Sequence, residues 1–207
     1  MARRPRDAGA TRLQILDAAE ALFAEHGFGS TSLATIARQS DTHKSLILHH
    51  FGSKEDLWQA VKERRFDSFT REQKDIFQRG RVTLDEIVQT TRAYFRLLQG
   101  DPVLVQLLTR AELEKDIGCS QYDEVRLSAF VERLRQAQQA GILRPDIPPA
   151  HLLLIIVNVI TQWFEARAIF STWSELQSEH LDDDFLDSFI KLFFHGAGVT
   201  GEAGAAS

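Results

Sequence analysis

Residues 31–57 of the chain read TSLATIARQSDTHKSLILHHFGSKEDL, and this stretch decides the fold. It holds two short segments with helical spacing of apolar residues, one on each side of a polar break at residues 40–43. Two short helices joined in this way form a helix-turn-helix, whose second helix enters the major groove of DNA. The same spacing is also found in connectors of ordinary helical bundles. Spacing alone therefore leaves both interpretations open.

Helical periodicity continues on both sides of this stretch, with glycine and proline between the periodic segments. No run of five or more residues alternates between apolar and polar as a strand does. The sequence predicts an all-α protein of about nine helices, with a three-helix DNA-binding head and a larger helical body. The expected helices cover about 11–26, 33–39, a segment ending at 51, 53–79, 83–99, 102–116, 120–140, 150–173 and 184–195.

Composition limits the class of protein. Of the 207 residues, 43% are hydrophobic and 26% are charged, as in ordinary soluble globular chains. The single cysteine, Cys119, excludes a disulfide framework and a thiolate zinc site, so we expect a reducing, cytoplasmic location. The most apolar stretch, 152–170, is interrupted by polar and charged residues, and we expect it not to span a membrane.

The net charge of −5 conceals a difference between the two ends of the chain. Residues 1–54 hold seven basic and five acidic side chains, or 7 − 5 = +2, and four of the seven histidines. The other 153 residues hold 17 basic and 24 acidic side chains, or −7. A mildly basic head on an acidic body is compatible with nucleic-acid binding, although the difference is small.

The second short helix would turn Ile47 and Phe51 toward the core and the rest of its surface toward DNA. Its side chains are able to bind phosphate, donate to base acceptors or touch a thymine methyl. We also expect backbone N–H groups near Thr31 and Ser32 and near Lys54 to face phosphates. The candidate groove residues are Lys44, Ser45, Leu46, His49 and His50.

Three motifs of the first sixty residues resemble the TetR (tetracycline-repressor-like) family of regulators. They are LQILDAAEALFAEHGF at 13–28, TSLATIA at 31–37 and HHFGSKEDL at 49–57, in the family's order and spacing. The resemblance covers about residues 11–60. Beyond that region, the chain matches the family only in length and helical layout.

The resemblance implies a homodimeric regulator, usually a repressor, that a small effector releases from a palindromic DNA operator. By position it implies that Thr31, Ser32 and Lys54 hold phosphates and that residues 44–50 form the recognition helix. This chain departs from the family at Asp41, Thr42, His43 and Leu48, where glycine, valine, serine and tyrosine are usual. The departure at Leu48 removes an expected phosphate contact, and those in the turn affect how the recognition helix is placed.

Two domains are expected: residues 1–54 as the helix-turn-helix domain and residues 55–207 as the effector-binding and dimerisation domain. A polar stripe on the 150–173 helix is either a seam in a dimer interface, a solvated edge or the lining of an effector pocket. We expect a mostly apolar effector, because basic residues are sparse among the apolar positions of the body. The candidate effector residues are Asn158, Gln162, Trp163 and Glu165, and the candidate dimer residues are Trp173, Phe185, Phe189, Leu192 and Phe193.

Other classes of protein fit the sequence less well. No nucleophile motif or paired base supports an enzyme, and we expect no cofactor. Adjacent side chains such as His49 and His50 point about 100° apart on a helix, so we expect no metal site. The runner-up is a helical ligand-binding or scaffold protein whose DNA binding is weak or lost, which the unusual turn favours.

The turn itself carries one further expectation. A tight bend of this kind often requires a positive φ at Asp41, which aspartate tolerates better than most residues. His43 is a poor N-cap, whereas Asp41 and Thr42 are better ones. We therefore expect the recognition helix to begin one or two residues early, capped by Thr42 or Asp41.

Overall fold

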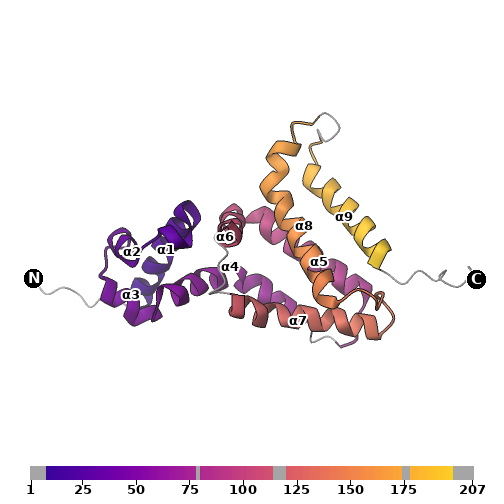
Figure 1. Ribbon diagram of the computed structural model, residues 1–207, viewed down its shortest axis with the longest axis horizontal. Coiled ribbons are helices and arrows are strands. Elements are labelled where there is room, and N and C mark those ends of the chain that lie inside the picture. The colour runs from indigo at the N-terminus through magenta and orange to yellow at the C-terminus, as the bar shows by residue number, and fades with distance from the viewer. Residues whose placement is uncertain (1–7, 78–79, 114–119, 174–177, 198–207) are drawn as a thin grey trace, which may run out of the picture. The chain divides into compact units, whose positions relative to one another are not determined.

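The computed structural model describes residues 8–77, 80–113, 120–173 and 178–197, and this part of the chain forms nine helices (Figure 1). In chain order the helices are α1 (Ala8–Ser30), α2 (Leu33–Gln39), α3 (Lys44–Phe51), α4 (Lys54–Phe77), α5 (Leu84–Gly100), α6 (Pro102–Leu113), α7 (Ser120–Gln139), α8 (Pro149–Phe170) and α9 (Leu181–Ala197).

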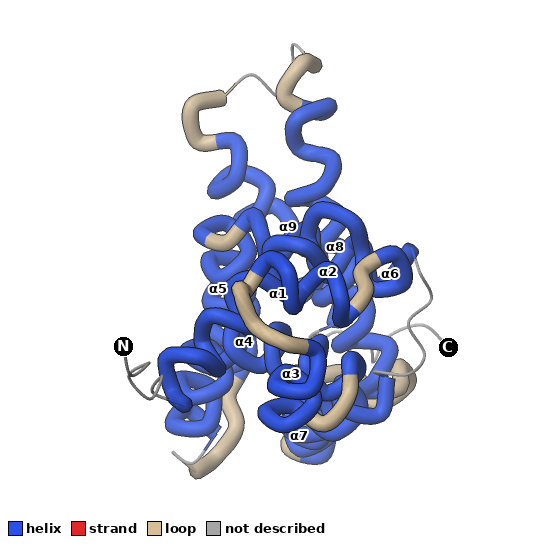
Figure 2. The backbone as a smooth tube through the Cα atoms, turned by 90° about the vertical axis from the view of Figure 1, so that its left-hand side faces the viewer, coloured by secondary structure: helices blue, strands red, loops and turns tan. Residues whose placement is uncertain are grey.

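The all-α prediction is confirmed. Figure 2 shows helices joined by short loops, and the described residues contain no β-strand. The expected boundaries hold to within a few residues at most helix ends. Gly27 interrupts α1 with a φ of 82°, which is where the sequence predicted its end. Pro102 and Pro149 stand in the first turns of α6 and α8, where their missing N–H groups cost nothing.

The chain forms two compact units. The first contains residues 1–68 and 102–123, and the second contains 69–101 and 124–207. The first unit therefore holds α1 to α3, most of α4, and α6. The second unit holds α5, α8, α9 and most of α7. The chain passes from one unit to the other three times, so each unit is built from segments that are distant in sequence.

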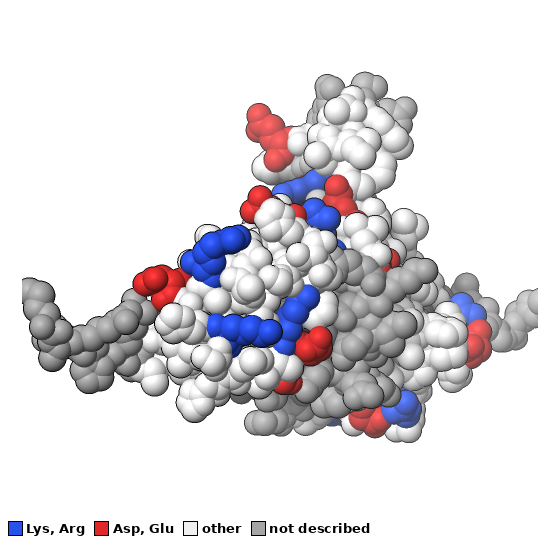
Figure 3. Space-filling view, turned by 60° about the vertical axis from the view of Figure 1, so that its left-hand side comes forward, with Lys and Arg blue, Asp and Glu red and all other residues white. Residues whose placement is uncertain are grey.

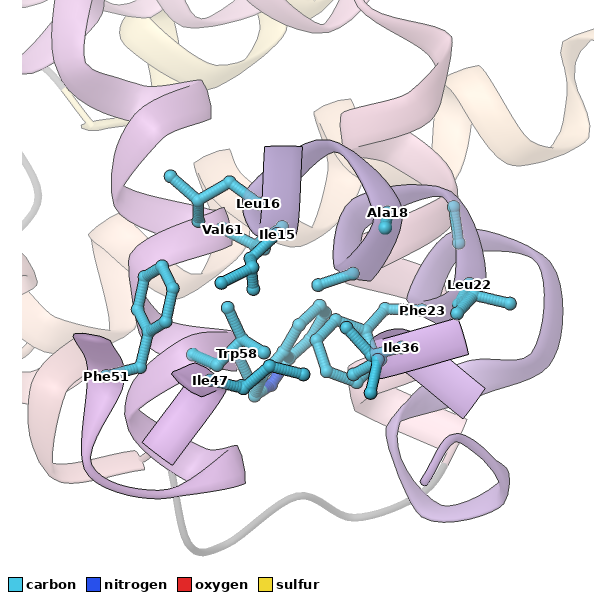
Figure 4. Packing of buried hydrophobic residues seen from close by; sticks show 14 of the residues in the cluster. Ile15, Leu16, Ala18, Leu22, Phe23, Ile36, Ile47, Phe51, Trp58 and Val61 are labelled. Atoms are coloured by element: carbon cyan, nitrogen blue, oxygen red, sulfur yellow. The ribbon is translucent and has the colours of Figure 1, made fainter. Parts of the chain in front are cut away.

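A core of aromatic and aliphatic side chains holds the first unit together (Figure 4). Phe23 of α1 and Trp58 of α4 lie at its centre, with ring centroids 5.1 Å apart in an edge-to-face arrangement. Ile47 of α3 is fully buried in the same cluster. Burial of a side chain of this size contributes about 1.5–3 kcal/mol, so this core fixes α3 against α1 and α4.

Helix α6 belongs to the same unit although 50 residues of sequence separate it from α3. Leu107 is 1% exposed within the core that also buries Ile47. At the surface, Arg110 Nη2 donates to the carbonyl oxygen of Glu25 at 3.1 Å. Helix α1 is therefore held from two sides, by α4 and by α6.

The second unit has its own core and its own ion pairs. Leu143 and Leu152 are buried in it together with Leu134 of α7. Arg133 of α7 makes two hydrogen bonds to the Glu86 carboxylate, at 2.5 and 2.7 Å, and a third to the Gly80 carbonyl. The hydrogen bonds to Glu86 raise the pKa of Arg133, against a smaller opposing effect of burial, and the negative charge of Glu86 adds to the rise. They tie α7 to the start of α5.

A buried carboxylate joins α1 to α4. Glu20 accepts hydrogen bonds from Arg65 Nε at 2.9 Å and from Arg64 Nη2 at 2.5 Å, and Arg64 also donates to Asp17 at 2.7 Å. Burial alone would raise the pKa of Glu20, but the bonds from Arg65 and Arg64 and their positive charges together lower it. The ionised form of Glu20 is thus favoured by folding.

We expect Glu20→Gln to lower the free energy of unfolding by about 2 kcal/mol at neutral pH, because two arginines lose a charged acceptor. Since the pKa of Glu20 is lower in the folded state, its contribution is present above the unfolded pKa and is lost as pH falls through the folded pKa. The difference between wild type and Glu20→Gln should therefore shrink in acid.

Urea unfolding at pH 7 and at stepwise lower pH measures this difference. Glu132→Gln is the control, because the Glu132–Arg135 pair is about half exposed on both sides and such pairs contribute little. An equal loss of stability for the two variants at pH 7 would contradict the prediction.

Candidate nucleic-acid interface

The turn between α2 and α3 is closed by hydrogen bonds of its own residues. Thr42 N donates to the Ala37 carbonyl at 2.9 Å, and Ser40 Oγ donates to the Ile36 carbonyl at 2.8 Å. The hydroxyls of Ser40 and Thr42 are 2.7 Å apart. Asp41 has a φ of 46°, the single positive value among described non-glycine residues. The expected positive φ at Asp41 is confirmed.

The expected early start of the recognition helix is wrong. Helix α3 begins at Lys44, and its N-cap is His43, whose side chain makes no capping hydrogen bond. The reason lies in the turn: the Thr42 backbone N–H bonds back to α2, and the Thr42 hydroxyl pairs with Ser40. With Asp41 in the left-handed region, this residue lacks the extended backbone that an N-cap requires.

The structure confirms which face of α3 is buried. Ile47 is 0% exposed and Phe51 is 9% exposed, so these two residues anchor the helix. Of the candidate groove residues, Lys44, Ser45 and His49 are exposed, whereas Leu46 and His50 are half-buried. All five lie on one short helix.

Two features of this surface had no local signal in the sequence. Arg12 of α1 lies over the ring of Phe51, with its guanidinium carbon 4.9 Å from the centroid, which places an exposed cation beside the end of α3. Leu48 is 37% exposed on α3, next to His49. From the sequence alone, Leu48 is notable only because the family usually has tyrosine at this position.

The two residues before α2 occupy different environments. Ser32 is the N-cap of α2, and its Oγ accepts from Thr35 N at 3.1 Å. Thr31 is 2% exposed, and its hydroxyl donates inward to the carbonyls of Gly27 and Leu22 at 2.7 and 3.2 Å. The Thr31 side chain therefore supports the interface from inside and does not form part of its surface.

The start of α4 is capped by Ser53 and Asp56. Ser53 Oγ accepts from Asp56 N at 2.9 Å and donates to the Asp56 carboxylate at 2.5 Å. Gly52 has a φ of 85°, and a Cβ there would come within 3.1 Å of that carboxylate. The ammonium of Lys54 lies 4.1 Å from the ring centroid of Phe28, a cation–π contact that holds it beside the end of α1.

Charge on the head is mixed. Residues 8–54 contain four basic side chains (Arg12, Arg38, Lys44 and Lys54) and four acidic ones (Asp17, Glu20, Glu25 and Asp41). The face in Figure 3 carries side chains of both signs. Among the described residues, no group of three or more His, Cys, Asp or Glu side chains is placed to hold a metal ion.

The four candidate effector residues on α8 do not come together. Asn158 and Gln162 are exposed, Glu165 is half-buried, and Trp163 is buried. Trp163 Nε1 donates to Asp182 Oδ1 at 2.9 Å, and the other oxygen of Asp182 accepts from Arg167 at 2.5 Å. The Trp163 indole thus has a partner within its own chain.

The candidate dimer residues are divided in the same way. Phe185 stacks on Trp163 with centroids 3.9 Å apart, Phe189 is 8% exposed, and Phe193 is half-buried. Trp173 and Leu192 are 56% and 79% exposed. The aromatic residues of α9 are therefore largely occupied by packing within one chain.

Comparison with known proteins decides the family. Residues 15–61 match the family described as bacterial regulatory proteins, tetR family, and residues 86–184 match the tetracyclin repressor-like C-terminal domain. The HTH-type transcriptional regulator UidR of Escherichia coli is 31% identical over 160 residues, which are 74% of this chain and 79% of UidR. The chain belongs to the TetR family.

Further relatives agree with this assignment. The HTH-type transcriptional repressor AcnR of Corynebacterium efficiens is 25% identical over 173 residues, covering 83% of this chain and 89% of AcnR. These relatives are transcriptional regulators rather than enzymes, and this TetR-family chain is a DNA-binding regulator.

Solved structures show the same fold. A TetR family regulator from Marinobacter aquaeolei has a TM-score of 0.71 at 18% identity, covering 96% of this chain and all of that one. NalD, the secondary repressor of the MexAB-OprM multidrug efflux pump in Pseudomonas aeruginosa, has a TM-score of 0.72 at 20% identity. It covers 93% of this chain and 98% of its own.

We expect His43→Ser to raise the free energy of unfolding by about 0.5–1 kcal/mol, because serine would supply the capping acceptor that His43 lacks. Ser32→Ala is the counterpart. It should lower the free energy of unfolding by about 1 kcal/mol, because the substitution removes a capping hydrogen bond that is present. Thermal melts of the three proteins make the comparison. A loss of stability in His43→Ser would show that the imidazole has a structural contact that serine cannot replace.

Proposed function

We propose that this regulator is a homodimeric repressor of the cytoplasm that reads a palindromic operator through α3. A small, mostly apolar effector releases it from DNA. Residues 1–54 are the DNA-binding domain, and residues 55–207 bind the effector and form the dimer. The observation that carries the proposal is the outward face of α3, where Lys44, Ser45 and His49 are exposed while Ile47 anchors the helix from behind.

Positive groups around α3 support the orientation on DNA. Lys44 lies at the start of the helix, Arg12 lies over Phe51 at its end, and Lys54 begins the next helix. Ser32 stands at the N-terminus of α2, where backbone N–H groups attract anions. These groups are proposed to bind phosphates and position the helix, while Ser45, Leu46, His49 and His50 face the bases.

The exposed face of α8 supports the dimer. Leu154, Ile155 and Val159 are 49%, 44% and 37% exposed, and they follow one another at helical spacing. A second copy of the chain covering this face would remove the apolar surface from water. Asn158 and Gln162 lie on the same exposed side and are proposed to form a polar seam in that interface.

By length and composition alone, the 22-residue helix α8 is apolar enough to cross a membrane. Core helices of soluble proteins share this length and composition. Asn158 and Gln162 on its exposed face favour a protein partner over lipid, because an unpaired amide in hydrocarbon is costly.

The proposed effector site lies in the second unit, on the inner side of α8. Trp163 and Glu165 remain its candidate residues. Trp163 is buried on that side, whereas Glu165 is half-buried and lies close to the stripe of Asn158 and Gln162. Aromatic residues surround this part of the unit. The ring centroids of Phe95 and Phe164 are 4.7 Å apart, and those of Phe69 and Tyr94 are 5.9 Å apart. These surroundings support an apolar effector with one or two polar groups.

The DNA-binding proposal is tested by measuring affinity for the promoter region next to the chain's own gene over a range of salt concentrations. We expect a steep fall with salt, because each phosphate contact releases counterions. Lys54→Ala should weaken binding to all sequences alike and reduce the salt slope by about 1. His49→Ala should also change base preference. Lys191→Ala, an exposed lysine of α9, is the control, and a salt response that stays flat would refute phosphate binding.

The dimer proposal is tested by Ile155→Glu, which would bury a carboxylate in the interface. Sedimentation at micromolar concentration should give twice the 23.4 kDa chain mass for the wild type and the single chain mass for the variant. Leu13→Glu is the control, because Leu13 is 55% exposed on α1 and should leave the dimer intact. A dimeric Ile155→Glu protein would move the interface away from this face of α8.

A further inference from the structure

The recognition helix presents an apolar side chain where the sequence indicated only a missing contact. Leu48 is 37% exposed, although the other well-exposed positions of α3 are polar or charged. Exposed leucines are common singly on protein surfaces and need no explanation there. This one stands on the eight-residue helix whose outward face is the proposed DNA-reading surface.

The geometry of α3 places Leu48 at the edge of the reading strip. Successive helical residues are about 100° apart, so Ser45 and His49 lie about 160° around the axis from Ile47. Leu46 and Leu48 lie about 100° from Ile47, one on each side. Because Ile47 is fully buried, the strip that faces outward has polar residues in the middle and a leucine at each margin.

The charge and size of the side chains around this strip match the major groove of DNA. Lys44 and Arg12 place positive groups toward the two ends of α3, as a phosphate backbone requires on either side of a groove. Ser45 is small enough to let the helix approach closely. The major groove presents one apolar group, the C5-methyl of thymine, beside the polar edges of the bases. A leucine at the edge of a polar strip matches that combination.

We propose that Leu48 is a specificity-determining residue that packs on a thymine methyl in each half of the operator. This inference rests on the proposed function and adds the base and the atom that are read. Leu46 flanks the strip on the opposite side and is half-buried, so less of its surface is available. Leu48 is therefore the leucine that supplies the apolar contact.

The test begins by selecting bound sequences from a random pool of double-stranded DNA with the full-length protein. In the selected operator, each thymine is then replaced in turn by uracil, which removes only the C5-methyl. At one position in each half-site, wild type should lose about fourfold in affinity, the value for one buried methyl group. Leu48→Ala should bind the thymine and uracil forms equally at that position.

Two variants control the measurement. Leu84 of α5 is 38% exposed, which matches Leu48, so Leu84→Ala should retain the full thymine dependence. Leu48→Met keeps an apolar side chain of similar size and should retain most of the thymine dependence. Thermal melts verify that all variants are folded, which is expected because alanine and methionine are good helix formers.

The outcomes separate the two proposals. Equal thymine dependence in wild type and Leu48→Ala at every position overturns this inference alone. A loss of affinity in Leu48→Ala that is the same for all sequences also overturns it, because such a loss would mean that Leu48 contacts the sugar–phosphate backbone. A pool with no enriched sequence overturns the proposed function and this inference with it.

Discussion

The burial of Ile47 in the core formed by Phe23 and Trp58 is the constraint on which the proposed DNA-reading surface depends. Helix α3 has only eight residues and is too short to be stable alone. Its orientation therefore comes from the core, and the residues two positions to either side of Ile47 face outward as a consequence. A change in that core would rotate the reading strip even if no exposed residue were altered.

The same core makes the head responsive to other parts of the chain. Trp58 belongs to α4 and Leu107 belongs to α6, and both are about 1% exposed in the cluster that buries Ile47. Outside the core, Glu20 binds two arginines of α4, and Arg110 of α6 bonds to the end of α1. Helix α4 crosses from the first unit into the second, and α6 begins shortly after α5 in the chain. A shift of either helix would therefore act on α1 directly.

Local patterns in the sequence were sufficient for the helices and the anchors of α3, because these depend on residues a few positions apart. The start of α3 was mispredicted because two local signals competed. The sequence allows Asp41 either a positive φ or a role as N-cap, and in the structure it has the positive φ while His43 is the N-cap. The inward bonds of Thr31, the position of Arg12 over Phe51 and the Glu20 pairs depend on chain segments that meet only after folding. Spacing on α8 places Trp163 about 100° from Gln162 around the helix axis, but it did not show which of these two faces is buried.

The charge balance of the head bears on how such a regulator would select its site. Four basic residues between 8 and 54 are offset by four acidic ones, two of which, Asp17 and Glu20, are paired with arginines of α4. Residues 1–7 add three arginines and one aspartate. Binding to any DNA regardless of sequence depends on phosphate neutralisation, and a head with so few cations gains little from it. Discrimination must then come from short-range contacts along α3, where hydrogen bonds and apolar packing on base edges depend on sequence. The composition of the head thus favours selectivity over strong general attraction to DNA.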